Sequence, residues 1–249
     1  LIQEQNSFPG ITNRILSKTV DSICVAFEGM ERFFPNERIV LTGNPVRQEI
    51  IAMGGKAEEG VSHFGLQPGV KTILVIGGSQ GARSVNQALA KILDQILDQQ
   101  VQMLWQCGVS FQDTARALAA ELPEEKAKRL KVMDFISRMD LAFAASDVVI
   151  SRAGAIAISE ICAVAKPPVF VPFPAAAEDH QTKNAQALVD QGAALLVPDR
   201  EAMDKLGPAV LGLMEDMERK KQLAENLGKL AIRDSAEKIA EEILKLVTK

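Results

Sequence analysis

"VIGGSQGARSVNQAL" (residues 75–89) runs from apolar residues through three glycines into a segment with helical spacing. Residues 71–76, KTILVI, are typical of a buried strand, and Val85, Leu89 and Ile92 recur on one face of the helix that would follow. Strand, glycine turn and helix in this order are typical of an open α/β sheet, whose ligands bind where the strands end. The stretch therefore predicts an α/β fold with a binding edge at this turn.

The alternation of strand and helix continues to about residue 198. Short connections separate these segments, so we expect a Rossmann-like parallel sheet with helices on both faces, closed by two charged amphipathic helices. The expected strands lie at 101–108, 130–135, 147–151, 167–173 and 193–198, and the helices between them at 112–122, 137–146, 155–165 and 179–192.

The first residues fit this unit poorly. Residues 11–27 indicate a helix running into a strand, and residues 37–47 a second strand ending in a turn at Pro45. We interpret residues 1–46 as the tail of another domain, 47–230 as the main domain, and 231–249 as a C-terminal helix that packs back toward the first.

Composition excludes several classes of function. The 249 residues are 47% apolar, enough for a buried core, yet no apolar run approaches the roughly 18 to 20 residues of a membrane span. The net charge of −4 is spread along the chain and Tyr is absent, which disfavours nucleic acid as a partner. The three cysteines show no paired spacing, which favours reduced thiols. Because the chain does not start with Met, we expect residues upstream.

The glycine turn is open to two interpretations. Its backbone and the hydroxyl of Ser79 can hold a phosphate at the start of a helix, or the glycines serve only a tight connection. A Walker A loop is excluded, because Ala82 and Arg83 follow Gly81 where Lys and Ser or Thr are needed. An NAD site is disfavoured, because the second strand ends in Gln106 and Cys107 without a carboxylate for the ribose.

Other polar residues follow later strands at the same expected edge. Glu160 can accept two hydrogen bonds from a ribose diol, and Gln181 offers a donor and an acceptor for a sugar hydroxyl pair. Each also has a structural interpretation: Glu160 as a first-turn acid favoured by the helix dipole, Asp179 as an N-cap, His180 as a surface residue. Arg47 and Arg152 would then be exposed charges. No DxD sequence occurs, so neither a metal nor a cofactor is indicated.

Five motifs carry a resemblance to a known family: residues 3–14 (QEQNSFPGITNR), 43–47 (GNPVR), 77–87 (GGSQGARSVNQ), 135–160 (FISRMDLAFAASDVVISRAGAIAISE) and 172–188 (PFPAAAEDHQTKNAQAL). Together they resemble the MurG family, glycosyltransferases of bacterial peptidoglycan synthesis. The resemblance implies two Rossmann-like domains of the GT-B type with the donor in the cleft between them. It also implies inverting transfer of N-acetylglucosamine from UDP-N-acetylglucosamine to the MurNAc 4-hydroxyl of undecaprenyl-pyrophosphoryl-MurNAc-pentapeptide.

The resemblance also assigns roles, residue by residue. Asn6 would face the acetylamino sugar, Arg47 would reach the donor, and Ser79 the diphosphate. Ile136 would bind uracil through its backbone, Glu160 the ribose hydroxyls, and Gln181 the sugar ring. The backbone N–H groups of Ala155, Ile156, Ala157, Ile158 and Ser159 would face phosphate and sugar, with Gly78, Gln80, Gly81, Gly154 and Asn184 in support.

The sequence departs from the family in two places. Gln3 stands where the family has His, and the family's GGTGGH loop, with its proposed base, has no counterpart here. We therefore expect no catalytic residue in this chain, donor binding without appreciable transfer, and membrane contact only through the missing part, at the cytoplasmic face of the bacterial inner membrane. Two alternatives are a noncatalytic UDP-sugar-binding subunit that needs a partner chain, and an enzyme like UDP-N-acetylglucosamine 2-epimerase.

Overall fold

The computed structural model describes residues 1–248, and its largest element is a sheet of six parallel strands. The strands lie in the order β6-β5-β4-β7-β8-β9. Strands β5 and β6 follow β4 toward one edge of the sheet, and β8 and β9 follow β7 toward the other, so the order reverses between β4 and β7. Their bounds are β4 Thr72–Ile76, β5 Gln102–Gln106, β6 Leu130–Met133, β7 Val148–Ser151, β8 Pro168–Phe170 and β9 Leu195–Leu196. The α/β fold and its parallel sheet, as predicted, are confirmed, and the point where the order reverses is where such sheets bind ligands.

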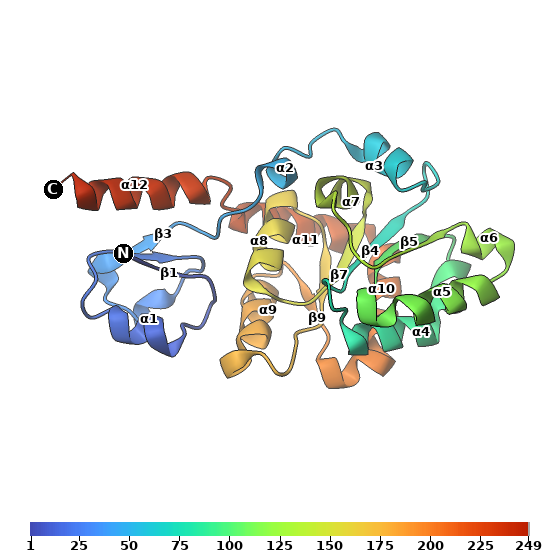
Figure 1. Ribbon diagram of the computed structural model, residues 1–249, viewed down its shortest axis with the longest axis horizontal. Coiled ribbons are helices and arrows are strands. Elements are labelled where there is room, and N and C mark those ends of the chain that lie inside the picture. Colours follow the sequence, from blue (N-terminus) through green and yellow to red (C-terminus); the bar gives the residue numbers. More distant parts are fainter. Residues whose placement is uncertain (249) are drawn as a thin grey trace.

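Helices cover both faces of this sheet (Figure 1). Side chains alternate between the faces along β4: Ile73 and Val75 pack with α4 and α10 on one side, whereas Leu74 packs with α7 and α8 on the other. The helices are α2 Gln48–Ile51, α3 Ala57–His63, α4 Arg83–Asp98, α5 Gln112–Glu121, α6 Glu124–Ala127, α7 Met139–Ala145, α8 Ala155–Val164, α9 His180–Asp190, α10 Ala202–Glu215, α11 Met217–Leu230 and α12 Ser235–Val247.

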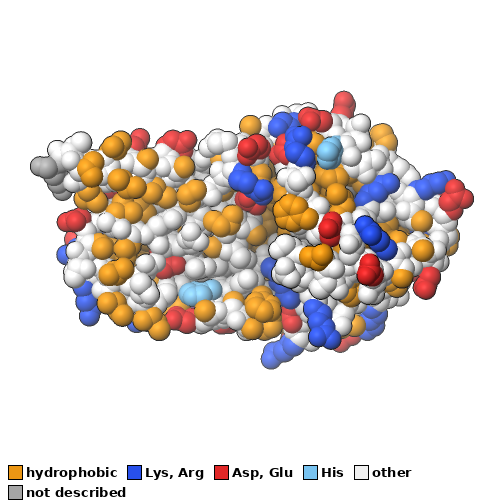
Figure 2. All heavy atoms as spheres, in the orientation of Figure 1, with side chains coloured by type: hydrophobic (Ala, Val, Ile, Leu, Met, Phe, Trp, Pro, Cys, Tyr) orange, Lys and Arg blue, Asp and Glu red, His pale blue; other side chains and the backbone are white. Residues whose placement is uncertain are grey.

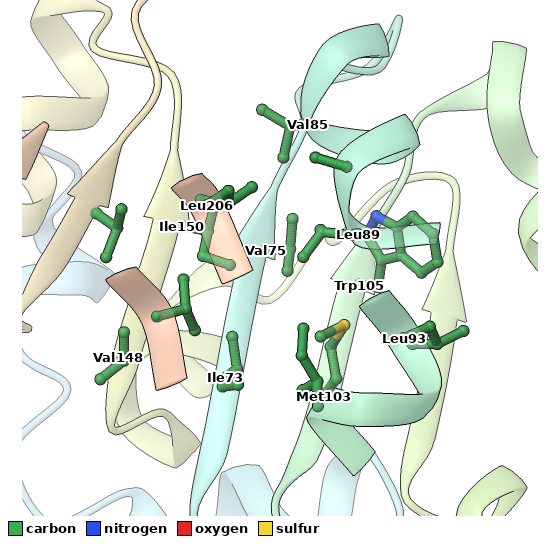
Figure 3. Packing of buried hydrophobic residues seen from close by; sticks show 14 of the residues in the cluster. Ile73, Val75, Val85, Leu89, Leu93, Met103, Trp105, Val148, Ile150 and Leu206 are labelled. Carbon is green, nitrogen blue, oxygen red and sulfur yellow. The ribbon is translucent and has the colours of Figure 1, made fainter. Parts of the chain in front are cut away.

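The core under α4 is built from the stripe that the sequence predicts. Val85, Leu89 and Leu93 lie over the central strands, beside the fully buried Trp105 (Figure 3). The indole Nε1 of Trp105 donates to Asn86 Oδ1 at 3.0 Å, so the one polar atom of this ring is satisfied. This packing fixes where α4 begins, directly after the glycine turn.

A second, small parallel sheet contains β1 Ile2–Glu4, β2 Ile23–Val25 and β3 Ile39–Leu41, with helix α1 Ile11–Leu16. Strand β1 was not predicted from the sequence, because its three residues are too few to show an alternating pattern. Helix α12 lies beside this sheet in Figure 1, where Ser22 Oγ donates to Glu242 at 3.2 Å.

Exposed apolar side chains gather at this end of the molecule (Figure 2), among them Ile11, Ile15, Leu41, Ile243, Leu244 and Val247. Within residues 1–248 no helix is long and apolar enough to cross a membrane.

Three helices, α10, α11 and α12, follow the last strand of the large sheet. The interior of α10 holds Gly207 and Pro208, a pair that ordinarily marks a break. A Cβ at Gly207 would lie 2.6 Å from Ile92 Cδ1, so α10 packs closely on α4 at this point.

Candidate functional site

The glycine turn after β4 is held against the end of β5. Gly77 N–H donates to the carbonyl of Gln106 at 3.0 Å, and Gly78 N–H donates to its side-chain Oε1 at 3.3 Å. Gly81 has a φ of +83°, and a Cβ there would collide with the carbonyl of Cys107, so only glycine fits. The tip carries Ser79, which is exposed and whose hydroxyl makes no hydrogen bond within residues 1–248.

Two helices begin at this edge of the sheet with their first N–H groups free of side-chain caps. Helix α4 starts at Arg83 behind the glycine turn, and α8 starts at Ala155 behind Gly154. Neither has an acidic residue in its first turn. Two uncapped helix N-termini at neighbouring strand ends form a positively polarised edge that suits an anion.

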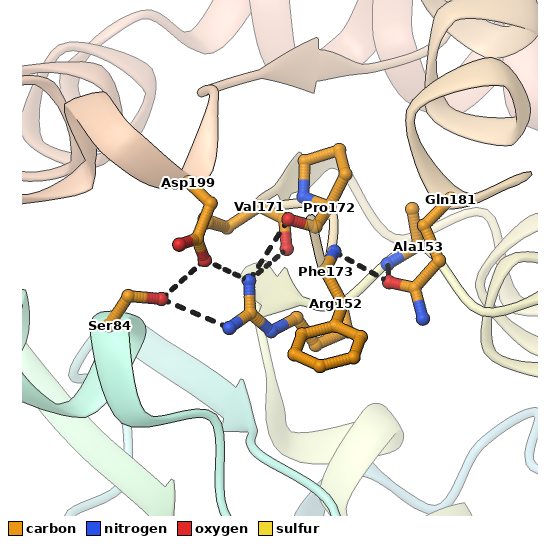
Figure 4. A network of polar contacts seen from close by, with 8 residues as sticks. All are labelled: Ser84, Arg152, Ala153, Val171, Pro172, Phe173, Gln181 and Asp199. Atoms are coloured by element: carbon orange, nitrogen blue, oxygen red, sulfur yellow. Dashed lines mark hydrogen bonds and ion pairs between the residues drawn. The ribbon is translucent and has the colours of Figure 1, made fainter. Parts of the chain in front are cut away.

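A network of polar contacts joins the loops after β7, β8 and β9 to the start of α4 at this same edge (Figure 4). Arg152 Nη1 donates to Asp199 at 2.5 Å and to the carbonyls of Val171 and Pro172, while its Nη2 donates to Ser84 at 3.0 Å. Its side chain is only 17% exposed, so the alternative that Arg152 is an exposed charge is wrong. A hollow of about 460 Å³ adjoins this network, and its lining includes Gly77, Gly81, Arg83, Arg152, Gln181 and Asp199.

Gln181 differs from the expectation that it offers both a donor and an acceptor. Its Oε1 already accepts the backbone N–H groups of Ala153 at 3.1 Å and Phe173 at 2.9 Å, as Figure 4 shows. This carbonyl ties the loop after β7 to the loop after β8. Only the Nε2 donor of Gln181 is left for a ligand.

Ile136, expected to act through its backbone, lies in the loop between β6 and α7. Its side chain is 1% exposed, and its N–H and C=O make no hydrogen bond within residues 1–248. The next loop residues are held by an ion-pair cluster that the sequence analysis did not anticipate. Arg138 donates twice to the buried Asp140, at 2.9 and 2.8 Å, and Lys56 donates to it at 3.2 Å.

Glu160 and Arg47, both expected to touch the donor, contact one another. Arg47 Nε lies 2.9 Å from Glu160 Oε1; the Glu160 side chain is 10% exposed and that of Arg47 is 51% exposed. Glu160 is the sixth residue of α8, so the alternative of a first-turn acid is wrong. The pair joins the segment after β3 to the second turn of α8.

The amide of Asn184 in α9 holds the loop after β1. Asn184 is fully buried, and its Oδ1 accepts the N–H of Ser7 at 2.8 Å and the Ser7 hydroxyl at 3.1 Å. Its Nδ2 donates to Asn6 Oδ1 at 3.0 Å and toward the carbonyl of Ala153. Asn6 therefore lies beside the start of α8, as the expected sugar contact requires.

Two buried polar residues missed by the sequence analysis organise the same loop. The carboxylate of Glu4 accepts from Asn6 N–H, Asn6 Nδ2, Gly10 N–H and Asn13 Nδ2. Asn44 donates to the carbonyl of Gln5 at 3.0 Å and to Ser159 Oγ at 3.1 Å. Glu4 lies in the motif of residues 3–14 and Asn44 in the motif of residues 43–47, so membership of these motifs was the sequence signal that could have identified them.

Asp179 and His180 begin α9 in a conformation that the N-cap alternative did not anticipate. Asp179 does occupy the N-cap position of α9, but it has a φ of +55° and its carboxylate accepts no N–H of the helix, so the capping hydrogen bond of this alternative is wrong. His180 is half-buried, and its buried Nδ1 has no hydrogen-bond partner within residues 1–248. A buried ring nitrogen without a hydrogen-bond partner is unusual in a folded protein.

Comparison with known proteins places the chain among glycosyltransferases. Residues 72–243 match the glycosyltransferase family 28 C-terminal domain. The chain is 48% identical over 249 residues to the UDP-N-acetylglucosamine--N-acetylmuramyl-(pentapeptide) pyrophosphoryl-undecaprenol N-acetylglucosamine transferase of Parabacteroides distasonis, covering 100% of this chain and 67% of that protein. It is 44% identical over 247 residues to the protein of the same name from Flavobacterium psychrophilum, covering 99% and 66%. The chain thus spans about two thirds of the length of these relatives.

Solved structures agree on the fold. The crystal structure of Acinetobacter baumannii MurG matches with a TM-score of 0.78 at 28% identity, over 98% of this chain and 66% of that one. UDP-GlcNAc 2-epimerase from Neisseria meningitidis bound to UDP-GlcNAc matches with a TM-score of 0.67 at 16% identity, over 96% and 66%, a likeness of fold alone.

Proposed function

The chain belongs to the MurG family of glycosyltransferases, and on that premise we propose that it is the donor-binding part of a UDP-N-acetylglucosamine-dependent transferase. The transferase would move N-acetylglucosamine to the MurNAc 4-hydroxyl of undecaprenyl-pyrophosphoryl-MurNAc-pentapeptide, at the cytoplasmic face of the inner membrane. The observation that carries the proposal is the pair of uncapped helix N-termini, α4 and α8, at the point where the strand order reverses.

The diphosphate would lie between these two helix ends. The first N–H groups of α8, those of Ala155, Ile156 and Ala157, have no partner within the helix and supply positive polarisation, and the exposed hydroxyl of Ser79 adds a donor. Charge builds up on the diphosphate as the sugar leaves. Fixed dipoles aimed at that charge stabilise the transition state without rearranging.

The uridine would occupy the side of the edge where Ile136 and Glu160 lie. The unused backbone N–H and C=O of Ile136 match the paired acceptor and donor of a uracil edge. The Glu160 carboxylate would accept from the ribose diol, which requires it to share or release its contact with Arg47. Because Arg47 is half-exposed, that contact costs little to give up, and the released guanidinium can follow the diphosphate.

The sugar would lie on the opposite side, near the start of α9. There the free Nε2 of Gln181 matches a sugar hydroxyl, and Asn6 approaches from the small sheet. In the reaction that we propose, the acceptor hydroxyl attacks C1 from one face of the sugar while UDP leaves from the other. The base that takes the hydroxyl proton would come from the third of the relatives that has no counterpart in these 249 residues.

Calorimetry with the 249-residue chain tests the proposal. We expect saturable binding of UDP and UDP-N-acetylglucosamine, weaker binding of UMP, and no binding of ADP at the same concentration. Absence of UDP binding by the folded chain would overturn the donor site. A transfer assay with the lipid-linked acceptor should show no appreciable product. Turnover by this chain would overturn the proposal that the catalytic base lies outside these 249 residues.

A further inference from the structure

A second hollow, of about 520 Å³, lies at the opposite edge of the six-stranded sheet, where β4, β7 and β8 begin. Lys71 stands directly before β4, Asp147 before β7 and Lys166 shortly before β8. The N-terminal part of α11 closes the hollow with Lys220 and Lys221. Because β4 has five residues, this place is about 15 Å from the glycine turn and separate from the donor site.

Positive charge dominates this hollow. Four lysines line it, and the lining contains one carboxylate, that of Asp147. Within residues 1–248 none of these four lysines has a carboxylate oxygen within ion-pair distance. Asp147 itself accepts the backbone N–H of Thr72 at 2.7 Å. The positive charges of this hollow are therefore balanced only at longer range, by Asp147 and by Asp216 near Lys220.

Among these four lysines Lys220 is the least accessible to water, because it is only 8% exposed. Its Nζ donates to the carbonyl of Met214 at 3.0 Å, and Lys71 Nζ approaches the same oxygen at 3.4 Å. An ammonium has three N–H donors, so this single acceptor within residues 1–248 leaves two unused. Burial, and next the charge of Lys71, lower the pKa of Lys220.

Helix capping explains only part of the arrangement. Met214 lies in the last turn of α10, and Lys166 Nζ donates at 2.5 Å to the carbonyl of Ser146, the residue directly after α7, so lysines do neutralise two helix C-termini. Lys221 caps nothing: it is exposed and makes no hydrogen bond within the described chain. The buried Lys220 and the half-buried Lys166, both with spare donors, lie beside the exposed Lys71 and Lys221 and are together the complement of an anion with several oxygens.

We propose that this hollow binds a phosphate-bearing anion through Lys71, Lys166, Lys220 and Lys221. The anion would place one oxygen on the spare donors of Lys220 and others between Lys71 and Lys221. The rim of the hollow includes the apolar Met53, Val164 and the exposed Met217. Such a rim accommodates either a free phosphorylated molecule or the headgroup of an anionic lipid.

The test uses inorganic pyrophosphate, titrated into the chain while UDP saturates the donor site. We expect measurable binding, weakened about tenfold or more in the Lys71→Gln/Lys221→Gln variant, which removes two exposed ammonium groups without unpairing a buried one. Lys229→Gln, an exposed lysine further along α11, is the matched control and should bind as the unmodified chain does. Thermal unfolding of both variants checks that the fold is retained.

Vesicle flotation separates the two sources of phosphate. Vesicles of phosphatidylcholine with phosphatidylglycerol would capture the unmodified chain, but not the double variant, if a lipid headgroup is the ligand. Pyrophosphate binding without capture would support a free anion. Equal behaviour of the unmodified chain and the double variant in both assays would overturn the proposal. Failure of UDP to bind would count against the donor site alone, since dependence on the lysines is measured separately.

Discussion

Arg47 and Glu160 lie 113 residues apart in the sequence and meet at 2.9 Å, Nε to Oε1. The contact joins the segment that leaves the small sheet to the helix that begins at the binding edge. Its two ends differ in environment, because the carboxylate is nearly buried while the guanidinium side chain is half exposed. The arginine can therefore move away at small cost, whereas the glutamate is held where a ribose would reach it.

Replacing Glu160 tests this arrangement. Glu160→Ala should weaken UDP binding about 10- to 100-fold, because hydrogen bonds from the ribose to a carboxylate are lost. Arg47→Ala should also weaken binding of UDP, through the diphosphate, but should leave uridine binding unchanged or tighter, because it frees the carboxylate. Calorimetry with both ligands measures this. Parallel losses for uridine and UDP in Arg47→Ala would contradict the exchange of partners.

Ser79 offers a test of the diphosphate position with little risk to the fold. Its hydroxyl is exposed and bonds to no group of residues 1–248, so Ser79→Ala should not change the free energy of unfolding measurably. We expect UDP to bind roughly 10- to 100-fold more weakly, the usual cost of one hydrogen bond to a charged group. Unchanged UDP affinity in this variant would place the diphosphate elsewhere.

The close approach of the glycine turn to β5 predicts unequal costs for two similar substitutions. Gly81→Ala should lower the free energy of unfolding by about 2 to 4 kcal/mol, because the new Cβ meets the carbonyl of Cys107. Gly78→Ala has a similar positive φ but open space around it, and should cost about 1 kcal/mol. Urea denaturation of the two variants compares them directly, and equal losses would show that φ alone limits the turn.

Most of the large sheet could be predicted from the sequence, because each strand and its helix carry their own periodicity. The contacts that assemble the site could not. Asn184 and Ser7 are 177 residues apart, and nothing in either segment identifies the other. Gln181 shows the same limit. Its side-chain amide offers a donor and an acceptor to a ligand, but two backbone N–H groups of neighbouring loops already donate to its oxygen. The proposed domain boundaries and donor contacts stay predictions.

Asn184 links the small sheet to the large one, so its removal should affect both stability and order of the loop after β1. Asn184→Ala unpairs the N–H of Ser7 and the Oδ1 of Asn6, and we expect a loss of about 2 to 4 kcal/mol in the free energy of unfolding. Hydrogen exchange should become faster at Ser7. Gln186→Ala, on the exposed face of the same helix, is the control and should cost under about 0.5 kcal/mol.

The ion pairs of Asp140, which lies near the expected uracil site, predict that the stability of the chain depends on pH. The hydrogen bonds from Arg138, and then that from Lys56, hold the pKa of Asp140 well below its usual range despite burial. A group whose folded pKa is lowered stabilises the protein above its unfolded pKa, about 4, and loses that contribution as the pH falls toward the folded value. Asp140→Asn should therefore lower the free energy of unfolding by about 2 to 3 kcal/mol at pH 7. The difference from the unmodified chain should shrink progressively below pH ~4.

Asp204→Asn supplies the control for this titration, because the Asp204 side chain is 82% exposed and its partner Lys91 is exposed as well. Such a pair contributes little, so this variant should follow the unmodified chain within about 0.5 kcal/mol at every pH. Chemical denaturation at a series of pH values measures both variants. Since Arg138 and Asp140 follow Ile136 in the same connection, Asp140→Asn should also weaken UDP binding at pH 7. A stability difference for Asp140→Asn that stays constant from neutral to acid pH would show that this carboxylate is not held ionised by its partners.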